Sequence, residues 1–226
     1  MSFSQKELSG MKNGIIRTVG ATAAFAVLAF AGVATASADP AETRAPVSTS
    51  ASAAAVPALP AGKIAFVSTV FGSYQPNNEW TTGLYVPKGW KDTKLSTDHH
   101  RYTGGKGHYS LRVNSWLDKP ASQQTAAKRK IAALKGTKGL KIVSLTTGQV
   151  KQTTSVERPV HYYTTLTYTY VDAKGAKRLV MTRWVADWSG PKRLAEVELT
   201  AAGRPMDKAG LTSVLAVATQ TLGRAG

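Results

Sequence analysis

Three of the four histidines lie close together beside a carboxylate, and imidazole and carboxylate groups are common zinc and copper ligands. Asp98, His99 and His100 are consecutive, and His108 follows a glycine-rich stretch. The spacing matches no known ligand pattern, and neighbouring side chains of an extended chain point in opposite directions. We therefore expect no metal or other cofactor and interpret this segment as a polar, mobile loop.

The residue patterns of phosphate binding and nucleophilic catalysis are also missing. The run from Gly104 to Gly107 has the spacing of neither the P-loop nor the dinucleotide motif, and no helix is predicted after it. The chain has no cysteine, no G-x-S-x-G and no H-E-x-x-H. Glu196 and Glu198 share one face of a predicted strand about 7 Å apart, as some glycosidase carboxylates do, but solvent-facing glutamates are more common. The sequence therefore predicts no catalytic residue.

Charge is the strongest functional signal. The chain has 29 basic and 13 acidic residues, a formal net charge of +16, and the stretch from Lys119 to Val156 contains no acidic residue. Charges within a Debye length of about 8 Å act together on a polyanion. We therefore predict a polyanion-binding patch centred on the exposed side of a helix. Its residues are Lys128, Arg129, Lys130, Lys135, Lys138 and Lys141.

Nucleic acid is the least favoured polyanion, because residues 119–156 contain no Phe, Trp or Tyr that could stack on bases. Insertion into a membrane is also disfavoured, since the apolar stripe of the predicted helix is narrow and needed by the core. The alternative is that a high net charge only keeps the protein soluble.

The first forty residues predict a cleavable export signal. Lys12 and Arg17 precede an apolar stretch at residues 19–34, and a small-x-small site ends at Ala38. We therefore expect residues 1–38 to be removed, a secreted protein, and no transmembrane span after processing. A retained N-terminal anchor is the alternative, and Met11 is an alternative start to Met1.

Residues 39–62 are rich in Ala, Pro and Ser and show no hydrophobic periodicity, which is typical of a flexible linker. Nothing later in the chain indicates a second linker or a repeat, so we predict one domain at residues 63–226. The absence of cysteine means that its stability comes from a core, and a chain of roughly 165 residues buries about 70% of its unfolded surface.

Hydrophobic periodicity predicts strands separated by one helix and followed by another. The predicted strands cover residues 64–71, 84–86, 106–117, 140–147, 149–157, 162–171, 179–188 and 194–200. One helix follows Ser122 and ends at Gly136, and the other follows Asp207 and ends at Gly223. Apolar residues on both faces place 179–188 at the centre of the sheet, and Asp172 begins a hairpin turn. The fold class is therefore α+β, with an antiparallel β-sheet and two packed helices.

The run Tyr85-Val86-Pro87-Lys88-Gly89-Trp90, followed by this order of elements, resembles the PsbP-like fold of secreted bacterial proteins. The resemblance covers about residues 63–223. It implies a small non-enzymatic module, although a fold by itself assigns no function. From the residues alone, Pro87 and Gly89 form a strand-ending turn that brings Trp90 back onto the core.

These observations favour an exported, monomeric, non-enzymatic binding module whose basic patch contacts an anionic component of the cell envelope. The alternative is a groove that recognises a small ligand or another exported protein, as an accessory or inhibitor, through Tyr109, Trp116 and Trp188. A hydrolase whose site is assembled from residues distant in sequence is the third interpretation.

Overall fold

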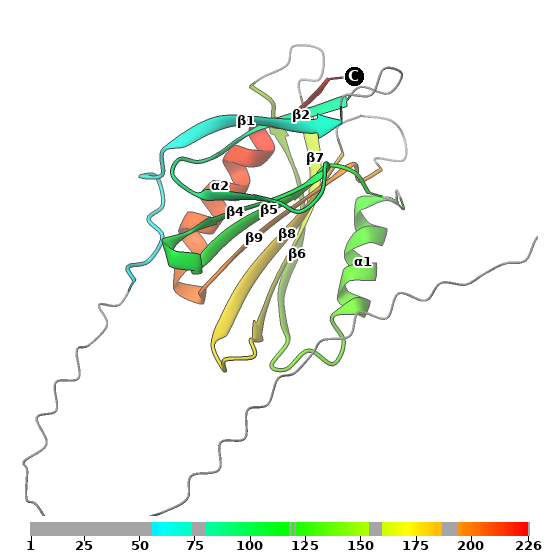
Figure 1. Cartoon of the computed structure of the whole chain (residues 1–226). Helices are drawn as coiled ribbons and strands as arrows, with labels where there is room; N and C mark the ends of the chain where they lie inside the picture. Colours follow the sequence, from blue (N-terminus) through cyan, green and yellow to red (C-terminus); the bar gives the residue numbers. More distant parts are fainter. Residues whose placement is uncertain are drawn as a thin grey trace, which may run out of the picture. The chain divides into compact units, whose positions relative to one another are not determined.

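Seven strands form one antiparallel sheet, and its order in space differs from the order in the chain (Figure 1). From one edge to the other the strands are β3 (Lys91–Lys94), β4 (His99–Gly104), β5 (Tyr109–Asn114), β9 (Val197–Gly203), β8 (Lys177–Ala186), β7 (Val160–Val171) and β6 (Lys141–Lys151). β8 is buried along most of its length, which confirms its predicted central position.

The computed structural model describes residues 56–73, 80–117, 119, 121–153, 160–186 and 194–225, which belong to one compact unit. The predicted export signal and Trp188 lie outside the described residues. Within these ranges, every helix is too short or too polar to cross a lipid bilayer.

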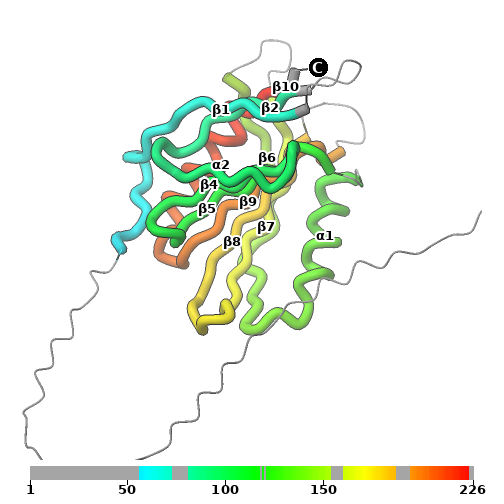
Figure 2. Tube along the Cα trace, viewed as in Figure 1, coloured from blue at the N-terminus to red at the C-terminus, as the bar shows by residue number. Residues whose placement is uncertain are grey.

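Helix α2 (Lys208–Gln220) packs between one face of this sheet and a second, smaller sheet of three strands (Figure 2). The small sheet contains β1 (Phe66–Ser73), β2 (Trp80–Pro87) and β10 (Gly223–Ala225). The predicted apolar stripe of α2 is fully buried, and Leu211, Val214 and Leu215 lie at the centre of the larger core. Trp90 packs against the same core, as predicted.

Helix α1 (Gln123–Ala133) lies on the opposite face and begins as predicted, because the Ser122 Oγ accepts a hydrogen bond from the Thr125 backbone N–H at 3.2 Å. Its contacts are with β7 and β8, where Ala127 meets Leu166 and Trp184 in a smaller core. Two helices on an antiparallel sheet confirm the predicted α+β class. Because α1 covers only one side of this face, the outward side chains of β3, β4, β5 and β9 stay uncovered by a described helix.

One strand prediction and one loop prediction are wrong, for reasons that lie in neighbouring strands. β6 runs unbroken through Gly148, where we predict the break between strands 140–147 and 149–157, because Gly148 pairs in register with Tyr163 of β7 and lies against its ring. The predicted loop at His99 and His100 is instead strand β4. It turns into β5 through a short 3-10 turn, η1 (Gly105–Gly107), in which Lys106 has a positive φ of 53°.

The end of the predicted linker is bound to the domain. Leu59 is buried against α2, and its backbone N–H donates to the Asp207 carboxylate at 3.0 Å. The Arg204 guanidinium donates to the backbone carbonyls of Val56 and Pro57, each at 2.7 Å. We call residues 56–59 the strap. Asp207 and Arg204 belong to the 3-10 turn η2 (Pro205–Asp207) and its cap, so Asp207 occupies the predicted N-cap position of α2 but its carboxylate binds Arg204 and the strap instead of the helix.

Candidate anion-binding face

The outward side chains of β3, β4, β5 and β9 form a polar surface beside α1, which we call the open face. Burial alternates along β4 and β5, so that His100, Tyr102 and Leu111 enter the core while Arg101 and Arg112 are exposed. The strand register sets Arg101 opposite Arg112, and Arg112 opposite Thr200 of β9. Local alternation positions each arginine, and strand pairing brings the two together.

Arg101 and Arg112 are an unfavourable pair for folding alone. Like charges directly opposite each other in a sheet are destabilising, by roughly 0.2–1 kcal/mol. Among the described residues, neither arginine forms an ion pair with a carboxylate. On the described strands of the open face, Glu198 is the one acidic side chain, because Asp92 of β3 turns to His100 on the other side. The open face therefore carries excess positive charge.

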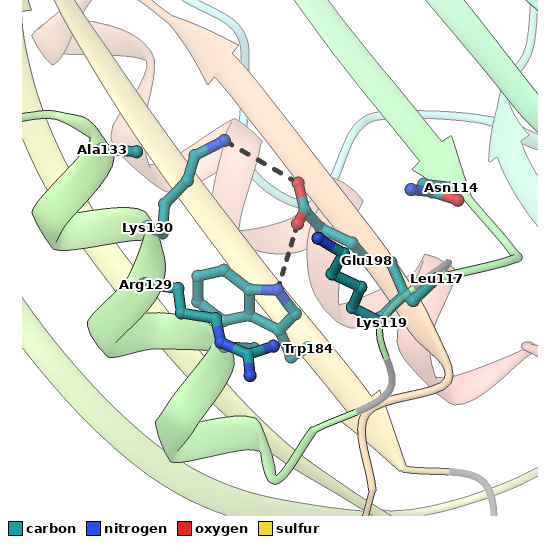
Figure 3. Close-up of a pocket in the computed structure, with 9 residues that line it drawn as sticks. Asn114, Leu117, Lys119, Arg129, Lys130, Ala133, Trp184 and Glu198 are labelled. Carbon is teal, nitrogen blue, oxygen red and sulfur yellow. Dashed lines mark hydrogen bonds and ion pairs between the residues drawn. The ribbon is translucent and has the colours of Figure 1, made fainter. Parts of the chain in front are cut away.

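A pocket of about 420 Å³ lies where the open face meets α1 (Figure 3). The floor is Trp184 of β8 and Glu198 of β9, and the register places these two residues opposite each other. Lys119, Arg129 and Lys130 bring three cations to its walls. The remaining lining residues are small or apolar apart from one amide: Asn114, Leu117, Ala126 and Ala133.

The Glu198 carboxylate is held in a defined position within this pocket. One oxygen accepts a hydrogen bond from the Trp184 indole N–H at 3.0 Å. The other accepts from the Thr200 hydroxyl at 3.4 Å and lies 4.0 Å from the Lys130 ammonium. A quarter of the Glu198 side chain is exposed, so the carboxylate keeps acceptor capacity toward the pocket.

The pocket and the arginine pair belong to one surface. Glu198 and Thr200 are two positions apart on β9, and Thr200 faces Arg112. Arg112 and Glu198 are therefore diagonal neighbours on β5 and β9, and such neighbours in an antiparallel sheet are roughly 7–8 Å apart. A ligand in the pocket can therefore extend over the arginine pair.

Tyr168 of β7 belongs to the smaller core together with Trp184 of the pocket floor. Burial, together with the neighbouring Tyr170 and Glu198, raises the pKa of Tyr168 to about 12. Its phenol therefore stays neutral at physiological pH. Among the described residues, no three His, Asp or Glu side chains gather where they could hold a metal ion.

The structure separates the residues of the predicted basic patch. Arg129 and Lys130 line the pocket, where they meet Lys119 from outside the predicted set. A helix turns about 100° per residue, so Lys128 lies on the flank of α1 away from the pocket. Lys135 and Lys138 are exposed beyond the end of α1, and Lys141 begins β6.

The three aromatic residues of the predicted groove are not gathered in the described structure. Tyr109 is buried in the core, and its hydroxyl donates to the Pro57 carbonyl at 2.7 Å. Trp116 is 47% exposed just after β5, and Trp188 lies outside the described residues. Burial of Tyr109 leaves no face for a ligand on its side of the strand.

Sequence reasoning missed Arg101, Arg112, Trp184 and the carboxylate of Glu198 as members of one site. Alternation along residues 106–117 and 194–200 places Arg112 and Glu198 on exposed faces, and these were the available signals. Pairing with Arg101 needs the β4–β5 register, which a segment interpreted as a loop does not supply.

No family model matches the chain, and no curated protein matches it. Among solved structures, the Ran-binding protein Mog1p of Saccharomyces cerevisiae is similar with 12% identity and a TM-score of 0.42, over 70% of this chain and 96% of Mog1p. LpqN of Mycobacterium tuberculosis, involved in cell envelope biogenesis, is similar with 14% identity and a TM-score of 0.45, over 71% of this chain and 92% of LpqN. At these values neither protein's partner or role carries over to this chain.

Proposed function

We propose that this protein is an exported binding module whose open face holds an acidic polymer of the cell envelope. The observation that supports the proposal most directly is the exposed pair Arg101 and Arg112, which the register sets opposite each other without a described carboxylate partner. The cost of this pair to folding is offset when an anion lies between the two guanidinium groups.

A polymer suits the open face because the cations are distributed over several elements. Lys91 is exposed on β3, the arginine pair follows on β4 and β5, and the pocket cations lie at α1 and Lys119. Adjacent strands are about 4.8 Å apart, so the surface spans more than one charged group of a ligand. Repeated phosphates or carboxylates can occupy these positions together.

The test compares two variants that lose the same charge. In Arg101→Gln/Arg112→Gln the open face loses its pair, whereas Lys128→Gln/Lys135→Gln removes two cations that do not line the pocket. With purified teichoic acid as the probe, we expect the arginine variant to bind at least tenfold more weakly. Its slope of log affinity against log salt should fall by about 2. The lysine variant should lose less than threefold.

Two results would contradict the proposal. Equal losses in both variants would mean that net charge, and not the open face, determines binding. Tighter binding of duplex DNA than of teichoic acid at the same salt concentration would point to a different class of polyanion.

A further inference from the structure

The geometry of the pocket points to a more specific ligand: we infer that it binds an amphoteric group, in which a phosphate or carboxylate is joined by a short chain to an ammonium. This inference rests on the proposed function for the anionic half of the ligand. It adds a role for Glu198, which simple binding of an anion does not explain.

A carboxylate at the floor of an anion site repels the ligand unless the ligand also carries a donor. Glu198 lies among Lys119, Arg129 and Lys130, and Trp184 and Thr200 both hold it in place. An ion pair with Lys130 does not by itself account for the position of Glu198. The Lys130 ammonium and the nearer Glu198 oxygen are 4.0 Å apart, at the limit of an ion pair. The loose pair leaves Glu198 able to accept a second cation.

The remaining walls limit the size of the group. Ala126 and Ala133 of α1 are small, and Leu117 and the Trp184 ring are apolar, so a short hydrocarbon link is favoured between the two charges. Asn114 faces Glu198 across the strand pair. Its amide oxygen accepts the Trp116 backbone N–H at 3.1 Å and has a second lone pair that can accept a hydrogen bond from an ammonium. The anionic half then lies toward Arg129 and Lys119, or toward Arg112 on the open face.

The experiment uses two probes that differ only in the ammonium, phosphoethanolamine and ethyl phosphate, with affinity measured by calorimetry on the whole protein. We expect phosphoethanolamine to bind about tenfold more tightly, as a charge-assisted hydrogen bond in a partly exposed site provides. In Glu198→Gln the two probes should bind with about equal affinity. Ethyl phosphate should bind this variant more tightly than the wild type, because the repulsion by the carboxylate is removed. Glu196→Gln, which loses the same charge outside the pocket lining, should keep the preference.

A second variant protects the test against misfolding. The substitution Ala133→Leu changes an exposed helix position and fills the pocket from α1, so it should weaken both probes at unchanged thermal stability. Equal affinity for the two probes in the wild type, or a preference that survives Glu198→Gln, would overturn the inference, and so would the absence of binding by both probes.

The source of the group is tested with the polymer itself. Teichoic acid that carries alanyl esters bears an ammonium, and mild alkaline hydrolysis removes it. Glu198-dependent loss of affinity after hydrolysis identifies a substituent of the polymer as the ligand, whereas preference on the small probes alone identifies a free molecule. Loss of polymer binding in all forms with the small-probe preference intact would reject the proposed function and retain the amphoteric site.

Discussion

At the scale of single residues, the pair Arg101 and Arg112 gives the open face positive charge and lowers the stability of the sheet. The chain places an arginine on each of two adjacent strands at positions that face each other, where threonine would suit a sheet better. Thr93 of β3 and Thr200 of β9 occupy the flanking positions of the same row. A charged pair in the middle of a row of threonines is therefore a local departure from what the sheet alone favours.

Removing one arginine should stabilise the protein while it weakens binding. We expect Arg101→Thr to raise the free energy of unfolding by about 0.2–1 kcal/mol in low salt, because it removes a like-charge contact and adds a β-branched residue. Urea unfolding measures this gain, and it should shrink at about 1 M salt, where the Debye length is roughly 3 Å. A loss of stability would show that Arg101 has a favourable structural role.

At the scale of elements, the strap fixes where the chain enters the domain. Asp207 is fully buried and accepts hydrogen bonds from the Leu59 and Arg204 backbone N–H groups and from the Arg204 side chain. Gly210 of α2 lies against the Leu59 backbone so closely that a side chain there would collide with it. The strap, the 3-10 turn and α2 therefore form one packed unit.

The buried carboxylate makes this unit sensitive to acid. Burial alone would raise the pKa of Asp207, but hydrogen bonds from the Arg204 side chain and from the Leu59 and Arg204 backbones outweigh it, so the pKa lies below its ordinary value of 3.8. A lowered pKa in the folded state means that the stabilisation is complete above pH 3.8 and is lost as the pH falls through the folded-state value.

Replacing this carboxylate should therefore have a cost that depends on pH. We expect Asp207→Asn to lower the free energy of unfolding by about 2–4 kcal/mol at pH 7, because Arg204 loses its partner. The difference from the wild type should narrow as the pH falls below 3.8. Urea unfolding at several pH values measures it, and limited proteolysis should show earlier cleavage within the strap. A difference that is constant with pH would mean that Asp207 does not titrate as described.

At the scale of the whole described unit, the seven-stranded sheet has two unequal covers. α2 buries six of its residues between two sheets, whereas α1 buries only Gln123 and Ala127. The smaller core under α1 also borders the pocket, through Trp184. The element that carries Arg129 and Lys130 is therefore the less firmly held of the two helices.

Native-state hydrogen exchange should resolve this difference. We expect the amides of α1 to exchange through a local opening whose free energy is lower than that of the α2 opening by at least roughly 2 kcal/mol. The reason is that the opening of α1 exposes less apolar surface. Saturating teichoic acid should slow exchange in α1 and leave α2 nearly unchanged. Equal protection of the two helices in the free protein would contradict the interpretation.

The amino-acid sequence determined the features whose cause is contained in one segment. The period of two along β5, the Ser122 cap of α1 and the buried stripe of α2 are confirmed because each depends on residues close in the chain. The turn at Asp172 belongs to the same group, since its carboxylate accepts hydrogen bonds from the Lys174 and Ala176 backbones. From these elements the α+β class follows.

Tertiary structure decided the features that need two distant segments. β4 has the composition of a loop, but it forms a strand because His100 stacks on Phe71 and binds Asp92. The polar linker end is held by Arg204 and Asp207, far away in the chain. In both cases the stabilising residues lie outside the segment that they stabilise.

The same limit applies to the candidate site. The sequence predicts a patch around consecutive cations in α1, but helical geometry places them on different sides of the helix. Of these cations, Arg129 and Lys130 line the pocket and Lys128 does not. The strand register, in contrast, joins Arg101 to Arg112 and Glu198 to Trp184. Periodicity along a segment decides which side chains are exposed, but the pairing of strands decides which exposed charges meet.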